Sequence, residues 1–536
     1  MFGATALRTL SFPVAAAVTS SAALRTADGR AARADKITDD IPPPTYTTVP
    51  NMIGGDVKIA ELLHLRDLGF ASKNVPNTEY FFGGKDAGFS KSSTGQKYSK
   101  MIGENDCVLV DIVQTDSSSK PDAGGPKNMT AYHRSGPREY LHFQPKKVRA
   151  AIVNCGGLCP GLNDVVHHLV GTLTHNYDVE KIYGIRGGYY GFGTNKNGPP
   201  LELTTDMVKD IHQMGGSFLG SGRGGYDEER IVEFLKKEKI NQVYVIGGDG
   251  THRGIYKLSQ ACANRGLNIA VAGVPKTIDN DIALIDRSFG FQSSVQAAQD
   301  AITTAETEAR GNMPNGIGLV KLMGRSSGYI AAYSTLAHGS VDLCLVPEVP
   351  MCIDGPLSCL EHLENIVEQK GYAVAVVAEG AGEELLGENA EVDAGGNKKL
   401  PQIGEFMKTK IAEHFKSKGK EATVKYIDPS YMIRSVPANA DDSYYCSLLG
   451  QGAVHAAMAG YTGFSIGLVN NHTVLLPIPA LVAKSPRTMN KHGRTWERVL
   501  AVTHQPDVHT AGSSKPAKKA TPAPASSSWF GFGAKK

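Results

Sequence analysis

Between Lys147 and Asn470 the sequence repeats one pattern, in which a short apolar run precedes a stretch with helical periodicity. The runs are VRAAIVNCGG (148–157), KIYGIRGG (181–188), VYVIGGDG (243–250), IAVAGVPKT (269–277), GIGLVKLMG (316–324), VDLCLVPEV (341–349) and YAVAVVAEG (372–380). Alternating strands and helices are the units of parallel sheets covered by helices. Because such sheets bind ligands at the carboxyl ends of their strands, the pattern predicts an α/β fold with functional residues at those ends.

The units are too many for one compact sheet, so we expect two doubly wound, Rossmann-like lobes with parallel sheets and an active-site cleft between them. A chain of 536 residues can also hold more than one domain. Residues 51–145 read as irregular, and the regular pattern fades beyond Asn470. The predicted parts are a leader or disordered segment (1–45), an N-terminal extension (46–145), a catalytic core (146–470), a C-terminal segment packed on the core (471–511) and a low-complexity tail (512–536).

Composition narrows the class of protein. A hydrophobic content of 41% and a charged content of 20% fit a soluble globular enzyme. The net charge of +3 comes without a basic stripe, so we expect no nucleic-acid partner. No apolar run approaches the ~20 residues of a membrane span. The eight cysteines lack zinc-ligand spacing and are expected to be free thiols.

The first residues predict either import into an organelle or a plain extension. Met1 to Ala27 contains no acid, two arginines and many Ala, Ser and Thr residues, which resembles a transit peptide. A disordered extension has the same composition. The predicted location is therefore the cytoplasm or, if the leader directs import, a mitochondrion or plastid.

The stretch Val243 to Thr251 combines an apolar strand with the turn Gly-Gly-Asp-Gly-Thr, and a helical pattern starts at His252. A strand that ends in such a turn can offer backbone amides to phosphates. Asp249 is the only acid in the turn, and a carboxylate beside phosphates needs a divalent cation. The turn predicts a nucleotide-phosphate and Mg²⁺ site with Asp249 as metal ligand. The alternative is a turn whose glycines only permit positive φ.

Two carboxylates follow the next apolar run, in Pro275 to Asp281. A phosphoryl acceptor hydroxyl must lose a proton, and a carboxylate can accept it. Asp279 is the predicted base, and Asp281 could orient a lysine or Mg²⁺ or hold the base. The alternative is an Asx-rich turn in which both acids cap the backbone.

Glycine-rich and arginine-bearing segments supply further candidates. The segment 156–163 opens a helix, and the chain has no Walker-type G-x-x-x-x-G-K-[ST] motif. The segment 220–225 (GSGRGG) formally matches G-x-G-x-x-G, but no clean strand precedes it, so Arg223 is assigned to a phosphate. Arg325 suits a sugar phosphate or a transition-state oxygen. Glu379, at the end of an apolar strand, suits a polar group such as a sugar hydroxyl.

Taken together, these segments resemble the phosphofructokinase family. The matching motifs are CGGLCPGLN (155–163), GSGRGG (220–225), GGDGT (247–251), PKTIDND (275–281), MGRSSGYIA (323–331), VPEV (346–349), AEG (378–380) and YMIR (431–434). The plant- and protist-type ATP-dependent branch is most similar, through YIDPSYMIRSVPANADD and AMAGYTGFSIGLVN.

The resemblance implies phosphorylation of D-fructose 6-phosphate to D-fructose 1,6-bisphosphate, with ATP as co-substrate and Mg²⁺ as cofactor. It also implies a homo-oligomer, often a tetramer. Asp279 corresponds to the proton acceptor. The implied ATP-binding residues are Gly157, Arg223, Gly224, Gly248, Asp249, Gly250 and Thr251, with Asp249 also on the metal. The implied sugar-phosphate residues are Thr277, Ile278, Asp279, Met323, Gly324, Arg325, Glu379, Tyr431, Met432, Ile433 and Arg434.

Two positions bear on the phosphoryl donor. The resemblance implies that pyrophosphate-using relatives carry Asp where this chain has Gly250, and Lys at position 276, where bacterial ATP enzymes have Gly. This chain is mixed, with Gly250 and Lys276. An Asp at 250 would repel the α-phosphate by roughly 4 kcal/mol at ~4 Å and an effective dielectric near 20, about a thousandfold in affinity. Gly250 therefore favours ATP, and Lys276 is compatible with it. The alternatives are a pyrophosphate-dependent enzyme, another GGDGT-type kinase such as an NAD or lipid kinase, a dehydrogenase, and a non-catalytic nucleotide-binding protein.

Overall fold

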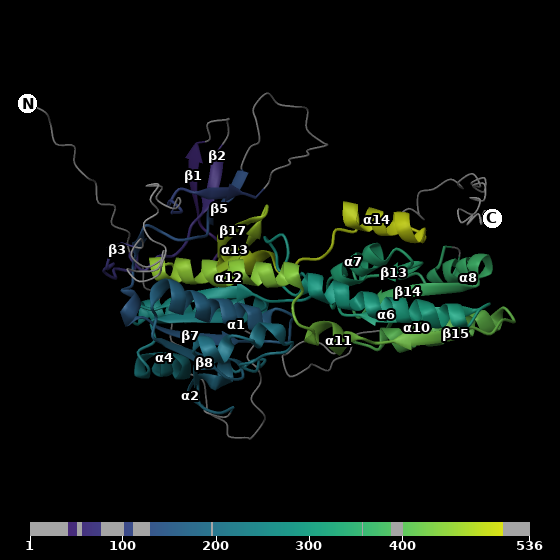
Figure 1. The fold of residues 1–536 in the computed structure, drawn as a ribbon. Coiled ribbons are helices and arrows are strands. Elements are labelled where there is room, and N and C mark those ends of the chain that lie inside the picture. Colours follow the sequence, from purple (N-terminus) through teal and green to yellow (C-terminus); the bar gives the residue numbers. More distant parts are fainter. Residues whose placement is uncertain are drawn as a thin grey trace, which may run out of the picture. The chain divides into compact units, whose positions relative to one another are not determined.

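The structure is a computed structural model that describes residues 41–50, 56–76, 101–110, 129–194, 197–355, 357–386 and 400–507 (Figure 1). Residues 1–40 of the predicted leader and the whole predicted tail (512–536) lie outside the described residues. All described residues belong to one compact unit, Lys36–Lys536.

The centre of the larger sheet consists of parallel strands in the order β16-β11-β10-β7-β8. Their bounds are β7 (Arg149–Asn154), β8 (Lys181–Ile185), β10 (Gln242–Gly247), β11 (Ala270–Pro275) and β16 (Phe464–Val469). Every residue of β10, β11 and β16 is buried. Strands covered on both faces need apolar residues throughout, which is why they read as continuous apolar runs.

The edges of the larger sheet are mixed, which differs from the prediction of purely parallel sheets. The added strands are β9 (Leu201–Glu202) beyond β8 and β17 (His472–Pro477), β5 (Met129–Arg134), β2 (Asp56–Ala60), β1 (Tyr46–Pro50) and β4 (Cys107–Leu109) beyond β16. The short pair β3 (Val75–Pro76) and β6 (Tyr140–Leu141) stands apart. The expectation that residues 51–145 are irregular was therefore wrong for the described strands.

The expectation that regular structure fades beyond Asn470 was also wrong. Asn470 and Asn471 both have positive φ, 51° and 60°, and join β16 to β17 as a hairpin with Val469 opposite His472. Two left-handed residues give a two-residue turn whose twist matches the strands. Helices α13 (Ile478–Lys484) and α14 (Arg494–Thr503) follow. The Asn-Asn pair was the signal for the hairpin.

Helices cover both faces of the larger sheet. Buried residues of α1 (Leu162–Gly171) and α12 (Ala440–Ala459) share one hydrophobic cluster with it, and those of α4 (Glu228–Lys237), α5 (Asp249–Asn264) and α13 share another. The short helices α2 (Gly191–Thr194) and α3 (Thr205–Val208) lie between β8 and α4 in the sequence. This is the doubly wound arrangement that was predicted.

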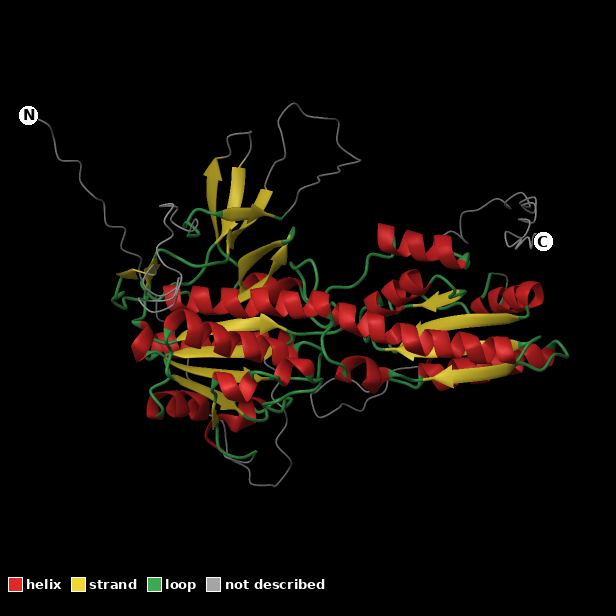
Figure 2. Cartoon of the chain, viewed as in Figure 1, coloured by secondary structure: helices red, strands yellow, loops and turns green. Residues whose placement is uncertain are grey.

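The second sheet is entirely parallel, in the order β13-β14-β12-β15, with helices above and below it (Figure 2). Its strands are β12 (Gly316–Leu322), β13 (Leu343–Leu345), β14 (Tyr372–Ala378) and β15 (Thr423–Ile427). Its helices are α6 (Phe291–Gly311), α7 (Tyr329–His338), α8 (Cys359–Lys370), α9 (Glu383–Leu386), α10 (Ile403–Ser417) and α11 (Ser430–Ser435).

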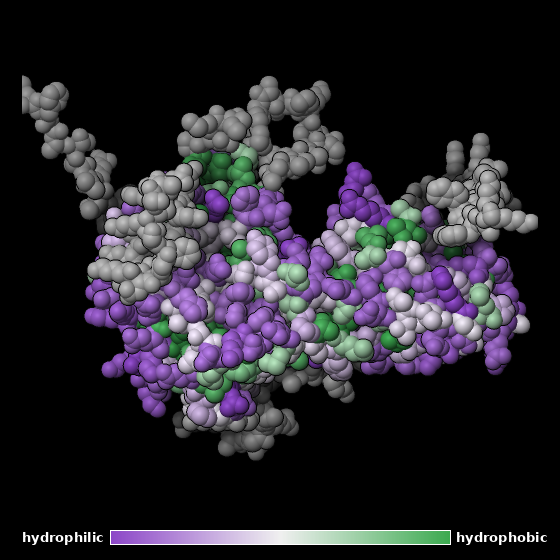
Figure 3. Space-filling model, in the orientation of Figure 1, coloured by the Kyte–Doolittle hydropathy of each residue, from purple (hydrophilic) through white to green (hydrophobic). Residues whose placement is uncertain are grey.

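The two lobes share a core. One hydrophobic cluster contains Ile246 of β10, Leu449 of α12 and Val320 of β12, so it is continuous from the first sheet to the second. On the opposite face of β12, Leu319 packs into a separate cluster with α8 and α10. On the face shown in Figure 3, hydrophilic residues predominate and hydrophobic residues form small groups. In the described ranges no helix combines the length and apolar character needed to span a bilayer.

Candidate active site

The glycine turn after β10 forms the start of α5. The helix begins at Asp249, with Gly248 as N-cap, rather than at His252 as the pattern indicated. A Cβ on Gly247 would lie 2.6 Å from the Cβ of Thr251, so glycine allows the helix to start directly at the strand end. The first N–H groups of a helix have no partners within it and favour an anion.

Asp249 retains an oxygen without a partner. Its Oδ2 lies 3.5 Å from Nε of Arg253, one turn further along α5. Its Oδ1 is buried and has no hydrogen-bond partner among the described residues. Burial raises the pKa of Asp249, Arg253 opposes the rise, and the negative charge of Asp281 adds to it. A second cation beside Asp249 would therefore be stabilised.

The residues present fit a magnesium ion held jointly with a substrate. Across the described part of the chain, no group of three or more His, Cys, Asp or Glu side chains could hold a metal unaided. Mg²⁺ commonly binds one or two carboxylates and completes its shell with phosphate oxygens and water. The unpartnered Oδ1 of Asp249 offers one carboxylate oxygen of this kind.

The segment after β11 is held from several directions. Lys276 is 5% exposed, and its Nζ donates a hydrogen bond to the Gly157 carbonyl at 2.6 Å. Burial lowers the pKa of Lys276. The Asp279 N–H donates to Oγ1 of Thr277 at 3.1 Å, and the Asp279 carbonyl accepts from Oγ of Ser327 at 2.9 Å. Ser327 follows β12, so the second lobe holds the backbone of the predicted base.

The Asp279 carboxyl group has a strongly perturbed environment. Its Oδ1 is buried without a hydrogen-bond partner in the described structure. Burial raises the pKa of Asp279 well above its usual range, the charges of Asp281 and Glu379 raise it further, and Arg325 and Lys276 oppose them. A carboxyl group of raised pKa beside two cations is suited to accepting a proton near neutral pH.

Asp281 connects the two predicted acids. Its negative charge raises the pKa of both Asp249 and Asp279. Burial raises the pKa of Asp281 as well, and a hydrogen bond from Thr277 opposes this. Asp249 and Asp279, from different strand ends, therefore belong to one group of carboxylates.

The second sheet contributes the MGR and AEG segments at one edge. Leu322 of β12 pairs with Ala378 of β14, and the Glu379 N–H donates to the Leu322 carbonyl at 2.9 Å. Met323, Gly324 and Arg325 follow β12 directly. Burial raises the pKa of Glu379, while Arg325 and Lys321 lower it. The predicted sugar residues of these two strands thus lie together.

The YMIR segment forms α11, and its side chains point in different directions. Tyr431 and Met432 are 75% and 70% exposed, whereas Ile433 is fully buried. The guanidinium carbon of Arg434 lies 4.9 Å from the centroid of the Tyr431 ring. Ile433, like the 6% exposed Ile278, lies in the core, so only its main chain could reach a ligand.

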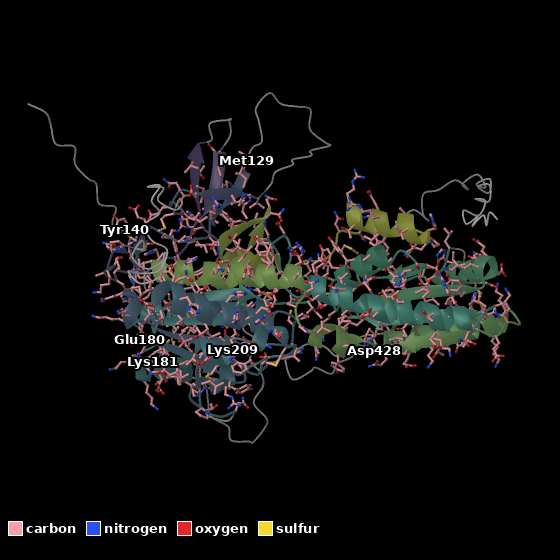
Figure 4. The ribbon with its side chains drawn as sticks, viewed as in Figure 1. Met129, Tyr140, Glu180, Lys181, Lys209 and Asp428 are labelled. Atoms are coloured by element: carbon pink, nitrogen blue, oxygen red, sulfur yellow. The ribbon has the colours of Figure 1, made fainter. Side chains whose placement is uncertain are left out.

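An ion pair fixes α11 to β12. Asp428, labelled in Figure 4, accepts a hydrogen bond from the Ser430 N–H at 3.1 Å. Its other oxygen lies 2.6 Å from Nζ of Lys321. The start of α11 is thereby attached to β12 at Lys321, two residues before Met323.

Arg223 and Arg434 flank the same glycine. A Cβ built on Gly157 would lie 3.6 Å from Nη2 of Arg223 and 3.8 Å from Nη1 of Arg434. The GSGRGG loop is held there because the Gly156 N–H donates to the Gly222 carbonyl at 2.9 Å. Arg434, predicted for the sugar phosphate, therefore lies beside residues predicted for ATP.

The GSGRGG loop lacks the context of a dinucleotide fingerprint. The described residues leading into it contain a 3-10 turn (Ile211–Gln213) and a loop instead of a strand. Gly224 has a φ of 71°, and Asp227 caps α4 by accepting from the Arg230 N–H. A dehydrogenase fingerprint requires a strand directly before the glycines.

Sequence reasoning assigned no role to several residues that hold this site. Ser327 lies in the quoted MGRSSGYIA segment, where a serine beside a functional arginine was a usable signal. Arg487 donates hydrogen bonds to the carbonyls of Asn280 and Ile285. It lies in SPRTMN, which has no recognisable pattern, whereas Lys321 and Asp428 lie in the quoted segments GIGLVKLMG and YIDPSYMIRSVPANADD without having been assigned a role.

Comparison with known proteins identifies the class. The phosphofructokinase family model matches residues 149–457, and the chain belongs to this family. Among its relatives is the protein named ATP-dependent 6-phosphofructokinase 5, chloroplastic, of Arabidopsis thaliana, 44% identical over 82% of this chain and 80% of the relative. ATP-dependent 6-phosphofructokinase of Amycolatopsis methanolica is 44% identical over 77% of this chain and 91% of the relative.

Solved structures agree on the fold. Pyrophosphate-dependent phosphofructokinase from Marinobacter aquaeolei superposes with a TM-score of 0.56 at 21% identity, covering 67% of this chain and 91% of that one. Phosphofructokinase from Saccharomyces cerevisiae gives a TM-score of 0.52 at 21% identity, covering 67% of this chain and 47% of that one. At these identities the likeness concerns the fold alone, and it confirms the predicted two-lobed α/β architecture.

Proposed function

We propose that this chain is an ATP-dependent 6-phosphofructokinase, which transfers the γ-phosphoryl group of ATP to the 1-hydroxyl of D-fructose 6-phosphate. One observation carries the proposal. Asp279 has a buried, unpartnered oxygen in a group that joins the glycine turn, through Asp281, to Arg325 and Glu379 of the second lobe. Relatives with this activity in their names are 44% identical over most of the chain.

In the proposed mechanism Asp279 removes the proton from the sugar hydroxyl. Its raised pKa makes it a stronger base than an ordinary aspartate, and Arg325 and Lys276 limit the rise. Base catalysis of this kind contributes ~10²–10⁴-fold. Ser327 holds the Asp279 main chain, so the carboxyl group is presented from a fixed position.

The phosphates of ATP would bind at the start of α5 and between Arg223 and Lys276. The N–H groups of Asp249 to Thr251 stand at a helix N-terminus, where an anion is favoured. Asp249 would hold Mg²⁺ through Oδ1, and the bound ion would neutralise charge on the phosphates. Arg434, which lies beside Gly157 and Arg223, would contact the group in transfer as well as the sugar phosphate.

The sugar phosphate would bind along the second lobe. Arg325 supplies a cation, and Glu379 an acceptor for a sugar hydroxyl. Met323 and Gly324, next to Arg325, and Thr277, whose Oγ1 accepts from the Asp279 N–H, would line the same region. The exposed Tyr431 and Met432 offer surface that a sugar phosphate would cover. Ile278 and Ile433 would contribute main-chain atoms.

A coupled assay on D-fructose 6-phosphate, with ATP and pyrophosphate offered separately, tests the proposal. We expect turnover with ATP and Mg²⁺. Asp279→Asn should reduce kcat ~10²–10⁴-fold while leaving ATP binding intact. Asp206→Asn, which alters an exposed aspartate in the first turn of α3, is the matched control and should behave as wild type.

Each other outcome points to a named alternative. Turnover with pyrophosphate alone would identify the pyrophosphate-dependent reaction, for which the buried Lys276 beside Gly157 is the favourable feature. ATP binding that does not depend on Asp279, with no product, would indicate a non-catalytic nucleotide-binding protein. Transfer of the γ-phosphoryl group of ATP to NAD or to a lipid, without transfer to fructose 6-phosphate, would indicate another GGDGT-type kinase.

We infer a homo-oligomer from the family, and light scattering of the purified chain measures its subunit number. The compartment depends on the leader. Two of the Arabidopsis relatives are named chloroplastic. A fluorescent protein fused after residue 45 should appear in an organelle and lose the leader if this segment is a transit peptide. Uniform cytoplasmic fluorescence would indicate a plain extension.

A further inference from the structure

The loop that carries the predicted base is irregular but largely buried. From Asp279 to Ile285 it forms no helix or strand, and Asn280 is only 3% exposed. Asn280 and Leu284 have positive φ values of 55° and 70°. Such conformations are strained for residues other than glycine and persist only where the surroundings hold them, and buried carbonyls need donors.

One distant residue supplies three of those donors. The Arg487 N–H donates to the Asp281 carbonyl at 2.6 Å. Its Nη2 donates to the Asn280 carbonyl at 3.0 Å, and its Nη1 to the Ile285 carbonyl at 2.9 Å. Ser485, two residues before Arg487, accepts a hydrogen bond from the same loop, because the Ala283 N–H donates to Oγ of Ser485 at 3.0 Å.

Residues 487–489 also contact the second lobe. The Arg487 guanidinium carbon lies 5.0 Å from the centroid of the Tyr329 ring in α7, and the Tyr329 hydroxyl donates to the Thr488 carbonyl at 3.3 Å. The Met489 N–H donates to Oε1 of Glu348 at 2.7 Å, and Glu348 also accepts from the Gly328 N–H. We call residues 485–489 the strap.

The geometry points to Arg487 as a positioning residue for phosphoryl transfer. The strap holds the loop of Asp279 and Asp281 at a fixed place relative to the start of α7, just after Arg325 and Ser327. Arg487 thus sets the direction in which the Asp279 carboxyl group meets the sugar hydroxyl, without touching either substrate. This inference rests on the proposed function.

Arginine is suited to this task because its planar fork donates in two fixed directions, here to Asn280 and Ile285. A lysine at this position would keep the charge and the main-chain bond but could not reproduce both side-chain bonds. When a mutation far from the reacting atoms displaces a catalytic group by about 1 Å, the rate can fall about a hundredfold.

The test compares Arg487→Met, Arg487→Lys and the control Arg494→Met. Arg494 is 86% exposed in its side chain and pairs with Glu497 on α14. We expect Arg487→Met to lower kcat per folded molecule by about a hundredfold, with KM for ATP and for fructose 6-phosphate within twofold of wild type. Arg487→Lys should recover part of the loss, and Arg494→Met should match wild type.

Circular dichroism gives the folded fraction, and thermal melting separates positioning from stability. A lower Tm with an unchanged kcat per folded molecule would show a structural role alone and overturn the inference. So would a kcat loss in Arg494→Met equal to that in Arg487→Met.

If Arg487→Met does not fold, the kcat values of Arg487→Lys and Tyr329→Phe distinguish a positioning role from a purely structural one. Tyr329→Phe keeps the ring under the guanidinium and removes only the bond to Thr488. Wild-type kcat in both would overturn the inference. A wild-type enzyme inactive on fructose 6-phosphate would refute the proposed function itself, whereas an active wild type with unaffected Arg487 variants would refute only the strap.

Discussion

Replacing Gly250 with aspartate tests whether the absence of a negative charge at position 250 allows ATP to serve as the phosphoryl donor. Gly250 is the second residue of α5 and is exposed, and a Cβ there would have nothing within 4 Å. The substitution therefore meets no steric obstacle. A carboxylate in the first turn of a helix is favoured by about 0.3–1 kcal/mol, so the variant should fold at least as well as wild type.

The size of the expected rise in KM for ATP depends on how exposed position 250 is to solvent. Like charges at ~4 Å repel by about 1 kcal/mol in water and about 4 kcal/mol at an effective dielectric of 20. Gly250 is exposed, while the neighbouring Asp249 has a buried oxygen, so the site lies between these limits. At 1.4 kcal/mol per factor of ten, KM for ATP should rise between about fivefold and a thousandfold.

The assay is steady-state kinetics with ATP as the varied substrate, at two salt concentrations. Gly250→Asn is the matched control because it has the same shape without the charge. We expect Gly250→Asp to raise KM for ATP well above the value for Gly250→Asn, with a smaller difference at high salt. Equal losses in both variants, or an unchanged KM in the aspartate variant, would refute the electrostatic reasoning.

Three further results are expected. Burial raises the pKa of Asp279 above its unfolded value near 3.9, so the stability of the wild type falls as the pH rises from about 4 toward the raised pKa. In the absence of substrates, Asp279→Asn should therefore have a higher Tm than wild type at pH values above the raised pKa and the same Tm near pH 4. A difference in Tm that does not change with pH would contradict this. Gly247→Ala should lower stability by about 1–3 kcal/mol because its Cβ would meet Thr251 at 2.6 Å, while Gly248→Ala, with only a 3.5 Å contact, should not; denaturant melts compare them. Glu379→Gln should raise KM for fructose 6-phosphate roughly ten- to hundredfold, the loss of a charged hydrogen bond of about 1.5–3 kcal/mol, and an equal rise in KM for ATP would argue against its assignment to the sugar.

The parallel strands β10 and β11 were predictable because every residue of each is buried, so both read as continuous apolar runs, whereas the partly exposed β15 did not. The mixed edges were not, since β9 has two residues and β4 three, too few to show a period. The hairpin of β16 and β17 depends on Asn470 and Asn471, two residues in the left-handed region. Helix α5 begins at Asp249 because the glycine turn is itself helical, which the apolar periodicity could not indicate.

By itself the sequence determined the family and the kinds of chemical group at the strand ends, because glycine turns, buried strands and acids at fixed spacing are local patterns. It did not decide which groups meet. The tertiary structure brought Asp249 and Asp279 together through Asp281, placed Arg434 beside Arg223, and put Arg487 on the loop of the base. These relations join residues far apart in the chain, and no local preference encodes a contact whose two halves are brought together only when the lobes pack.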